Sequence, residues 1–226
     1  MKRVGIIGGM GSMASADLYM KIVKLTPAKC DQDHILLTID NNAKIPDRTN
    51  YIYGDGKDPF PYLLDSVKRL ENSGCDAFCM ACNTAHYFAP KLITETKMKF
   101  LDMPKITVEN ISKNYKNAKK VAVVGTITTR KSKIYDKNLE KYGFESVEFS
   151  KEIENDIMKC IYEGVKAGKI AEKKDFFIET MSKIDADIFI AACTEIPLFL
   201  PFVPKEFKFV DATEELAKEI IKFANS

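Results

Sequence analysis

The segment KRVGIIG at residues 2–8 sets the plan of the chain, because a segment of the same character, KKVAVVG, returns at residues 119–125. Each begins with basic residues, continues as a short apolar run and ends at a glycine, which is typical of a buried strand in a parallel sheet. A second pair matches further along, CDAFCMACNT at residues 75–84 and ADIFIAACT at residues 186–194. The sequence therefore predicts two copies of one α/β unit, each with a cysteine just beyond a buried strand.

Short apolar runs alternate along the chain with segments whose apolar residues repeat at helical spacing. This alternation predicts parallel sheets joined by right-handed crossovers. We expect two similar lobes, each a parallel sheet flanked by helices, related by a pseudo-two-fold axis with the functional site between them. The first lobe is expected to comprise residues 1–104 and 208–226, because the last predicted helix returns to it, and the second lobe residues 105–207.

Three local predictions can be compared directly with a structure. The polar segment 41–58, which contains Pro and Gly, is expected to form a long loop near the site. Residues 132–142 are expected to form one helix that ends at Gly143, and residues 147–149 are expected to form a strand.

The composition of the 226-residue chain argues against several classes of function. A formal net charge of +2 gives no global reason to expect nucleic acid as a partner. No apolar run approaches the roughly 20 residues of a membrane helix, and the first residues lack the pattern of a signal peptide. With six cysteines and no secretory signal, we expect free thiols, a cytoplasmic location and no membrane partner.

The sequence GMGSMA at residues 9–14 follows the first predicted strand and precedes a helix. It fits the G-x-G-x-x-G/A fingerprint of dinucleotide-binding proteins, and Asp40 falls near the end of the second predicted strand. A nicotinamide-dependent oxidoreductase that uses Gly9 and Gly11 is therefore one alternative. The same turn would also serve a substrate carboxylate, because N–H groups at the start of a helix bind any anion.

The cysteines fall into two kinds by position. Cys75, Cys79 and Cys82 have the C-x3-C-x2-C spacing of an iron–sulfur loop, but the segment resembles a buried strand, so Cys75 and Cys79 are expected to be small core residues. Cys82 and Cys193 each end an apolar strand and begin a polar turn, where backbone N–H groups favour the thiolate form. His86, four residues after Cys82, is within reach along a helix and serves either to tune the thiol or to pack.

The chain resembles the aspartate/glutamate racemase family, the cofactor-independent amino-acid racemases. The two cysteine signatures of the family are similar to ACNTAH at residues 81–86 and ACTEIP at residues 192–197. The opening GIIGGMG at residues 5–11 and the loop IPDRT at residues 45–49 are most similar to the aspartate branch. The resemblance spans the whole chain and implies a two-lobed α/β fold that works without metal or cofactor.

The resemblance also implies which residues form the site. Cys82 and Cys193 are implied as the proton donor and acceptor, on the two sides of one α-carbon. Arg48 and Lys166 are implied to hold carboxylates, which favours a small acidic amino acid as the partner molecule. The other substrate contacts that the resemblance implies are Met10, Asp47, Asn83, Thr84 and Ala85.

We therefore expect an isomerase that interconverts L- and D-aspartate, or glutamate, through one thiolate and one thiol. Asn83, Thr84 and Thr194 are expected to donate hydrogen bonds to the carboxylate of the carbanion. A homodimer is expected from the habit of the family and the frequency of dimers. A sister reaction, such as isomerisation of a dicarboxylic acid, and a catalytically silent amino-acid-binding protein of the same build stay open as alternatives.

Overall fold

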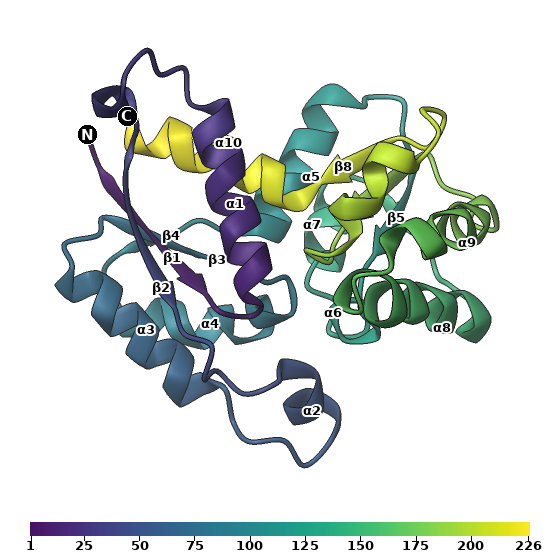
Figure 1. Ribbon diagram of the computed structural model, residues 1–226, viewed down its shortest axis with the longest axis horizontal. Coiled ribbons are helices and arrows are strands. Elements are labelled where there is room, and N and C mark those ends of the chain that lie inside the picture. The colour runs from purple at the N-terminus through teal and green to yellow at the C-terminus, as the bar shows by residue number, and fades with distance from the viewer. The chain divides into compact units, whose positions relative to one another are not determined.

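Each half of the chain forms a four-stranded sheet in which all neighbouring strands are parallel. The computed structural model describes residues 1–226, the whole chain. The strands are β1 (Arg3–Gly8), β2 (Leu36–Asn41), β3 (Ala77–Met80), β4 (Lys99–Phe100), β5 (Lys120–Val124), β6 (Glu145–Ser146), β7 (Ile188–Ala191) and β8 (Phe209–Asp211). Their order is β2-β1-β3-β4 in one sheet and β6-β5-β7-β8 in the other. The shared order confirms the prediction of two similar α/β lobes with parallel sheets (Figure 1).

Helices fill the connections between the strands. Those before β5 are α1 (Ser12–Leu25), η1 (Asp31–Asp33), α2 (Arg48–Tyr53), α3 (Phe60–Asn72), η2 (Thr84–Phe88), α4 (Ala89–Leu92), η3 (Ile93–Glu95) and α5 (Met103–Asn114). Those after β5 are α6 (Ile127–Lys131), α7 (Asp136–Lys141), α8 (Lys151–Lys159), η4 (Cys160–Lys166), α9 (Ile170–Ser182), η5 (Ile196–Phe202) and α10 (Ala212–Ala224). The segment η4 is a π-helix, and the other η segments are 3-10 helices.

The contacts within the chain divide it into two units, and the first unit is built from two separate segments. It comprises Met1–Ile106 and Thr213–Ser226, whereas the second unit is the continuous segment Thr107–Ala212. We call these units lobe 1 and lobe 2. The end of α10 is tied to the start of β1, because the backbone N–H of Lys2 donates to the carbonyl of Ala224 at 2.9 Å.

In lobe 1, helix α3 packs on one face of the sheet. Its residues Leu63, Val67 and Leu70 recur at helical spacing and are fully buried in a cluster with Ile7 of β1 and Phe78 of β3. Burying each side chain of this kind stabilises the fold by about 1.5–3 kcal/mol. The chain crosses the sheet in opposite directions from β1 to β2 and from β2 to β3, so right-handed crossovers place α1 and α3 on opposite faces (Figure 1).

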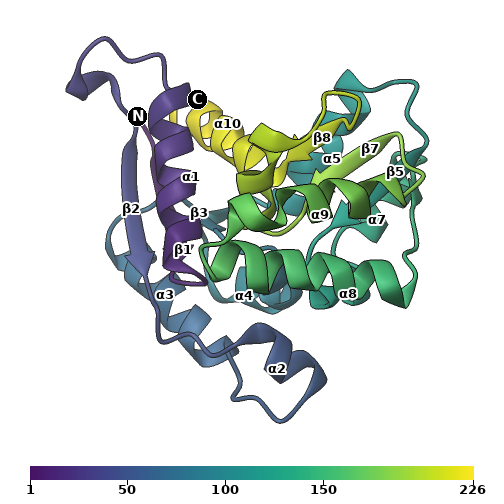
Figure 2. The ribbon, with the colours of Figure 1, turned by 45° about the vertical axis from the view of Figure 1, so that its right-hand side comes forward.

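In lobe 2, the helices α8 and α9 lie side by side, with η4 in contact with both (Figure 2). Ile157 of α8, Ile161 of η4 and Phe177 of α9 are buried against the sheet residue Phe189. The ring of Phe177 also stacks on Phe199 of η5, with the ring centroids 4.6 Å apart. This cluster fixes η5, the segment that directly follows the cysteine motif of this lobe.

The segment 41–58, predicted as a loop, contains the short helix α2 (Arg48–Tyr53). The helix begins because the carboxylate of Asp47 accepts a hydrogen bond from the backbone N–H of Asn50 at 2.8 Å. A carboxylate at this position satisfies one of the N–H groups that a helix start leaves without a partner. The prediction was wrong because the segment is polar and lacks the apolar period of a helix.

Within the predicted helix 132–142, only Asp136–Lys141 is helical, as α7, and residues 132–135 form a turn that follows α6. Lys133 has a φ of 53°, in the left-handed region, which cannot continue a right-handed helix.

The predicted strand 147–149 is also displaced, because β6 ends at Ser146. Only the N–H of Val147 continues the ladder, donating to the carbonyl of Val121 at 2.9 Å. Val147 and Phe149 are apolar because they pack against the core of lobe 2.

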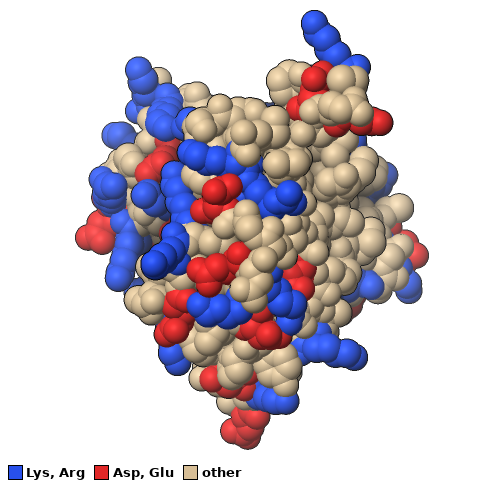
Figure 3. Space-filling model, turned by 90° about the vertical axis from the view of Figure 1, so that its left-hand side faces the viewer, with Lys and Arg blue, Asp and Glu red and all other residues tan.

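Charged side chains of both signs are interspersed on the face of the molecule drawn in Figure 3. This mixture agrees with the formal net charge of +2 and leaves that face without a continuous basic surface. Among the helices, none combines the length and the apolar character that a span across a membrane requires.

Candidate active site

Cys82 lies two residues beyond the end of β3, at the carboxyl edge of the sheet in lobe 1. The ladder still fixes the backbone one residue earlier, because the N–H of Ala81 donates to the carbonyl of Ile7 at 3.1 Å. Cys82 is 7% exposed and belongs to the buried cluster that also contains Met10 and Ala85. Ligands of open parallel sheets bind at this edge. The structure thus brings one predicted catalytic residue and two predicted substrate contacts together in one lobe.

The turn between β1 and α1 is held closed by Ser15. Its hydroxyl accepts a hydrogen bond from the N–H of Gly9 and donates to the carbonyl of Gly11, both at 3.1 Å. Gly9 has a φ of 83°, and a Cβ at this position would lie 2.3 Å from the backbone carbon of Asn42. Only glycine fits both this conformation and this close approach, so the turn that carries Met10 depends on it.

Arg48, the first residue of α2, is hydrogen-bonded to the same turn. Its Nη2 donates to the carbonyl of Met10 at 3.1 Å, and its Nη1 donates to the carbonyl of Pro46 at 3.0 Å. Its Nε is buried and has no hydrogen-bond partner. Leaving a buried donor unsatisfied costs about 1–3 kcal/mol, so a carboxylate that reached this nitrogen would be bound favourably. Asp47 is exposed and is used as the cap of α2.

The residues that follow Cys82 are buried, and one of them orders the backbone. Asn83 is 3% and His86 is 6% exposed. The Nε2 of His86 accepts a hydrogen bond from the N–H of Met103 at 3.3 Å, so Nδ1 carries the proton and donates to the carbonyls of Cys82 (2.9 Å) and Asn83 (3.1 Å). Burial lowers the pKa of His86, although the nearby Asp102 opposes the shift. These contacts favour the second of its two expected roles, which is packing.

Cys193 occupies the equivalent place in lobe 2. It lies two residues beyond the end of β7, and the N–H of Ala192 donates to the carbonyl of Val124 at 2.8 Å. The thiol of Cys193 donates to Oε2 of Glu195 at 2.9 Å, and the hydroxyl of Thr194 donates to the same oxygen at 3.1 Å. Cys193 and Thr194 are each 9% exposed. One carboxylate therefore joins the second predicted catalytic residue to a predicted substrate contact.

The other four cysteines have different surroundings. All six are free thiols, and Cys30 is exposed. Burial raises the pKa of the Cys75 and Cys79 thiols, and it raises the pKa of Cys160 to about 12. These three thiols are therefore protonated near neutral pH and act as small core residues, as the sequence predicted for Cys75 and Cys79. The side chains of His, Cys, Asp and Glu form no group of three or more that could hold a metal ion.

A family model described as Asp/Glu/Hydantoin racemase matches residues 7–220 of the chain. The chain belongs to this racemase family. It is similar to the broad specificity amino-acid racemase RacX of Bacillus subtilis (strain 168), with 26% identity over 226 residues that cover 96% of each protein. It is also similar to the solved structure of the Picrophilus torridus aspartate racemase, with 31% identity and a TM-score of 0.84 over 100% of this chain and 95% of that one.

A further relative is the glutamate racemase of Aquifex pyrophilus, which is 30% identical over 168 residues, 72% of this chain and 64% of that protein. Membership of the racemase family confirms the resemblance found in the sequence. It supports an isomerase that racemises amino acids, and it agrees with the two-lobed fold observed here.

Two residues of the racemase chain have surroundings that the sequence did not predict. Lys166, at the end of η4, is exposed, and its ammonium lies over the ring of Tyr162, 4.3 Å from the centroid. No role is predicted for Glu195 from the segment ACTEIP, yet its carboxylate accepts a hydrogen bond from the thiol of Cys193. A carboxylate at the N-cap position of η5, two residues after the cysteine, is the signal by which it could have been found.

The dinucleotide fingerprint also requires a carboxylate at the end of the second strand that can bind a ribose, and in this chain that carboxylate, Asp40, is already occupied. Both carboxylate oxygens of Asp40 accept hydrogen bonds from Arg69, from Nε at 3.0 Å and from Nη2 at 2.9 Å. A ribose would need this carboxylate for its hydroxyl groups. The glycine turn of the racemase is therefore better explained by the close packing of Gly9 against Asn42 than by a nicotinamide cofactor.

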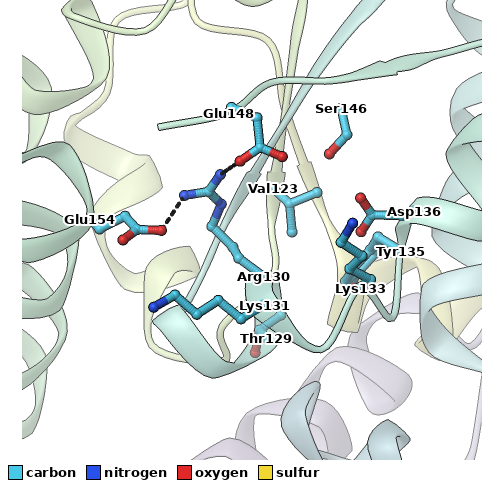
Figure 4. A pocket seen from close by; sticks show the side chains of 10 residues that line it. All are labelled: Val123, Thr129, Arg130, Lys131, Lys133, Tyr135, Asp136, Ser146, Glu148 and Glu154. Carbon is cyan, nitrogen blue, oxygen red and sulfur yellow. Dashed lines mark hydrogen bonds and ion pairs between the residues drawn. The ribbon is translucent and has the colours of Figure 1, made fainter. Parts of the chain in front are cut away.

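A separate pocket of about 170 Å³ lies within lobe 2, beside α6 and β6 (Figure 4). At its centre, Arg130 is paired with Glu154 at 3.0 Å and with Glu148 at 3.4 Å, and its guanidinium lies over the ring of Phe149. Burial lowers the pKa of Arg130, against the effect of these carboxylates. Because the cation is already neutralised by two anions, the pocket is best explained as an ion-pair cluster that holds the β6 connection in place.

Proposed function

We propose that this racemase interconverts L- and D-aspartate, or glutamate, without a cofactor, using Cys82 and Cys193 as the two acid–base groups. The observation that carries the proposal is the equivalent placement of the two cysteines. Each lies two residues beyond an inner strand, β3 or β7, of sheets that share one strand order. In each case the preceding residue is tied by its N–H to the neighbouring inner strand.

The reaction needs one thiolate and one thiol at opposite faces of the same α-carbon. The thiolate removes the α-proton and becomes a thiol, and the opposite thiol gives its proton to the resulting carbanion and becomes a thiolate. General acid–base catalysis contributes about 10²–10⁴-fold. Since the α-proton is very weakly acidic, hydrogen-bond donors must also stabilise the carboxylate of the carbanion. We assign this role to Asn83 and Thr84, and to Thr194 once its hydroxyl turns from Glu195 to the substrate.

An acidic amino acid is supported by the donors near Cys82. Arg48 carries a positive charge and a buried Nε without a partner, and its guanidinium is held against the Met10 turn. Similarity to the aspartate racemase of Picrophilus torridus supports aspartate over other acids. Because one methylene in a pocket is worth only about 1–3 kcal/mol, glutamate is kept as the alternative substrate. The remaining proposed contacts with the substrate are Met10, Asp47, Ala85 and Lys166.

The test is a chiral assay of aspartate and glutamate with no added cofactor. Cys82→Ser and Cys193→Ser should each lower kcat/KM by at least about 10²-fold, because a serine hydroxyl is a far weaker acid than a thiol and does not ionise to a base near neutral pH. Cys30→Ser is the matched control, since Cys30 is exposed, and it should leave the rate unchanged. In deuterated water, the wild-type protein should place deuterium at Cα as it inverts the substrate.

Racemisation at the wild-type rate in either active-site serine variant would overturn the two-thiol mechanism. Binding of aspartate without exchange of the α-proton would identify a silent binding protein, and turnover of a dicarboxylic acid alone would identify a sister reaction. Thermal stabilisation by a nicotinamide cofactor would favour the oxidoreductase, because a ligand that binds the native state raises its stability. The homodimer and the cytoplasmic location stay predictions.

A further inference from the structure

The two cysteines of this racemase have different neighbours. The thiol of Cys193 donates to a carboxylate oxygen of Glu195 at 2.9 Å, and Thr194 donates to the same oxygen. Glu195 is half-buried, and its contacts with Cys193 and Thr194 are hydrogen bonds to one carboxylate oxygen. The carboxylate therefore acts on the thiol as a hydrogen-bond acceptor.

The residues that follow Cys82 do not provide a carboxylate of this kind. It is followed by Asn83 and Thr84, which are uncharged. The nearest titratable ring on that segment is His86, whose Nδ1–H is used by the carbonyl of Cys82 rather than by its sulfur. The thiol of Cys82 has no hydrogen bond to a carboxylate in its own lobe. The two acid–base groups thus begin in unequal electrostatic surroundings.

A carboxylate next to a thiol favours the protonated form for two reasons. Only the S–H form can donate the hydrogen bond, and ionisation would place two negative charges about 3 Å apart. Cys193 also belongs to the apolar cluster of lobe 2, and charges in contact with such a cluster are weakly screened. Cys160 of the same cluster adds no charge near neutral pH, because burial raises the pKa of its thiol to about 12.

We propose that Glu195 is a positioning residue that keeps Cys193 protonated in the substrate-free enzyme, so that Cys193 starts as the proton donor and Cys82 as the base. This inference rests on the proposed two-thiol racemisation. In the first half of the cycle, the Cα–H bond breaks and its proton goes to the thiolate of Cys82. The S–H bond of Cys193 then breaks, and its proton forms the new Cα–H bond on the opposite face.

The cycle leaves a thiolate at Cys193 beside the carboxylate of Glu195, and this repulsion favours return to the starting form. Cys82 releases its proton to water, and Cys193 takes one from water, so that no net charge is gained or lost. The two enantiomers have equal free energy, so kcat/KM is the same in both directions whatever Glu195 does. The effect must therefore be measured on the thiol itself and on the pH profile.

The direct test follows the alkylation of Cys193 by iodoacetamide, read by mass spectrometry of its peptide between pH 6 and pH 10. The Cys82→Ser protein is compared with Cys82→Ser/Glu195→Gln. Removing the carboxylate should lower the pH midpoint of alkylation by about one unit or more and speed the reaction about tenfold near pH 7. Glu206→Gln is the matched control, because Glu206 is an exposed glutamate of the same lobe, and it should leave the midpoint unchanged.

The variant Glu195→Asp retains the carboxylate and so separates electrostatics from packing. Its pH midpoint of alkylation should lie closer to that of the protein with Glu195 than the midpoint of Glu195→Gln does. Glu195→Ala provides a second charge-free variant should the amide impair folding. In the protein with both cysteines, Glu195→Gln should move the alkaline limb of the kcat/KM profile to lower pH, because the donor thiol loses its proton earlier.

The inference would be overturned if the pH midpoint of Cys193 alkylation stayed the same or rose in both charge-free variants. Glu195 would then either have no effect on the thiol or help to remove its proton. The outcome does not depend on turnover, since alkylation reports the thiol alone. If the midpoint falls but no amino acid is racemised, the protonation of Cys193 is explained as proposed and it is the proposed function that fails.

Discussion

His86 connects the cysteine segment of lobe 1 to the start of α5. Its protonated Nδ1 donates to the carbonyls of Cys82 and Asn83, and its Nε2 accepts from the N–H of Met103. A neutral imidazole satisfies three backbone groups that would otherwise be buried without partners, and protonation would turn the acceptor Nε2 into a second donor facing an N–H. The ring therefore orients the backbone around Cys82 only while it is uncharged.

This arrangement makes the stability of the protein depend on pH. Burial lowers the pKa of His86 in the folded state below its ordinary value of 6.5. As the pH falls through 6.5, the unfolded chain takes up a proton that the folded chain still rejects, so the free energy of unfolding decreases with falling pH. Urea unfolding between pH 7.5 and pH 5.5 should show a steeper loss for the wild type than for His86→Gln. Equal slopes in the two proteins would contradict a neutral buried His86.

At the scale of the elements, the connection from β1 to α1 is shaped by the neighbouring loop after β2. The strands β1 and β2 are paired along their full length, so Gly8 lies opposite Asn41. The chain then turns at Gly9, whose left-handed conformation brings its Cα against the backbone of Asn42. The turn that positions Met10 thus depends on contact between two loops as well as on its own sequence.

The cost of the left-handed conformation of Gly9 can be separated from the cost of its contact with the neighbouring loop. The comparison uses a second glycine that has a similar φ but no such contact. Gly74, after α3, has a φ of 73°, and the side chain of an alanine there would point into open space. Gly74→Ala should cost about 1–2 kcal/mol of stability, the cost of a left-handed alanine. Gly9→Ala adds a backbone clash and should cost at least about 2 kcal/mol more, measured by chemical unfolding. Equal losses in the two variants would show that the loops can move apart freely.

At the scale of the whole molecule, lobe 1 is completed by the last segment of the chain. Leu216, Ala217 and Ile220 of α10 are fully buried. The side chain of Lys21 in α1 donates to Thr213 at 2.6 Å, and Lys2 lies over the ring of Phe223. The sheet of lobe 1 therefore reaches its full stability only after residues more than 100 positions away have folded back onto it.

Leu216→Ala tests this dependence, and it should cost about 2–5 kcal/mol because it opens a cavity in a packed core. Amide hydrogen exchange of β1, at the opposite end of the sequence, should become faster in the variant. Lys222→Ala on the exposed face of the same helix is the control, and it should stay within about 0.5 kcal/mol of the wild type. Unchanged exchange in β1 after Leu216→Ala would mean that α10 does not support the sheet.

Much of the fold could be predicted because its strands are marked locally. The apolar runs that end at Gly8 and Gly125 form β1 and β5, and the runs before the two cysteines form β3 and β7. Local pattern failed where a contact or a single dihedral angle decides the structure. The helix α2 begins at a side-chain cap in a polar segment, and a turn with a positive φ at Lys133 replaces the start of a predicted helix.

The sequence by itself determined the repeat of two parallel α/β units and the place of each cysteine beyond a strand, because periodicity and chain order are sufficient to define them. Only the tertiary structure decided what each cysteine and its neighbours touch. It directs the ring of His86 to the backbone, the guanidinium of Arg69 to Asp40, and the carboxylate of Glu195 to the thiol of Cys193. These contacts depend on side-chain directions and on packing between elements, which residue spacing along a chain does not specify.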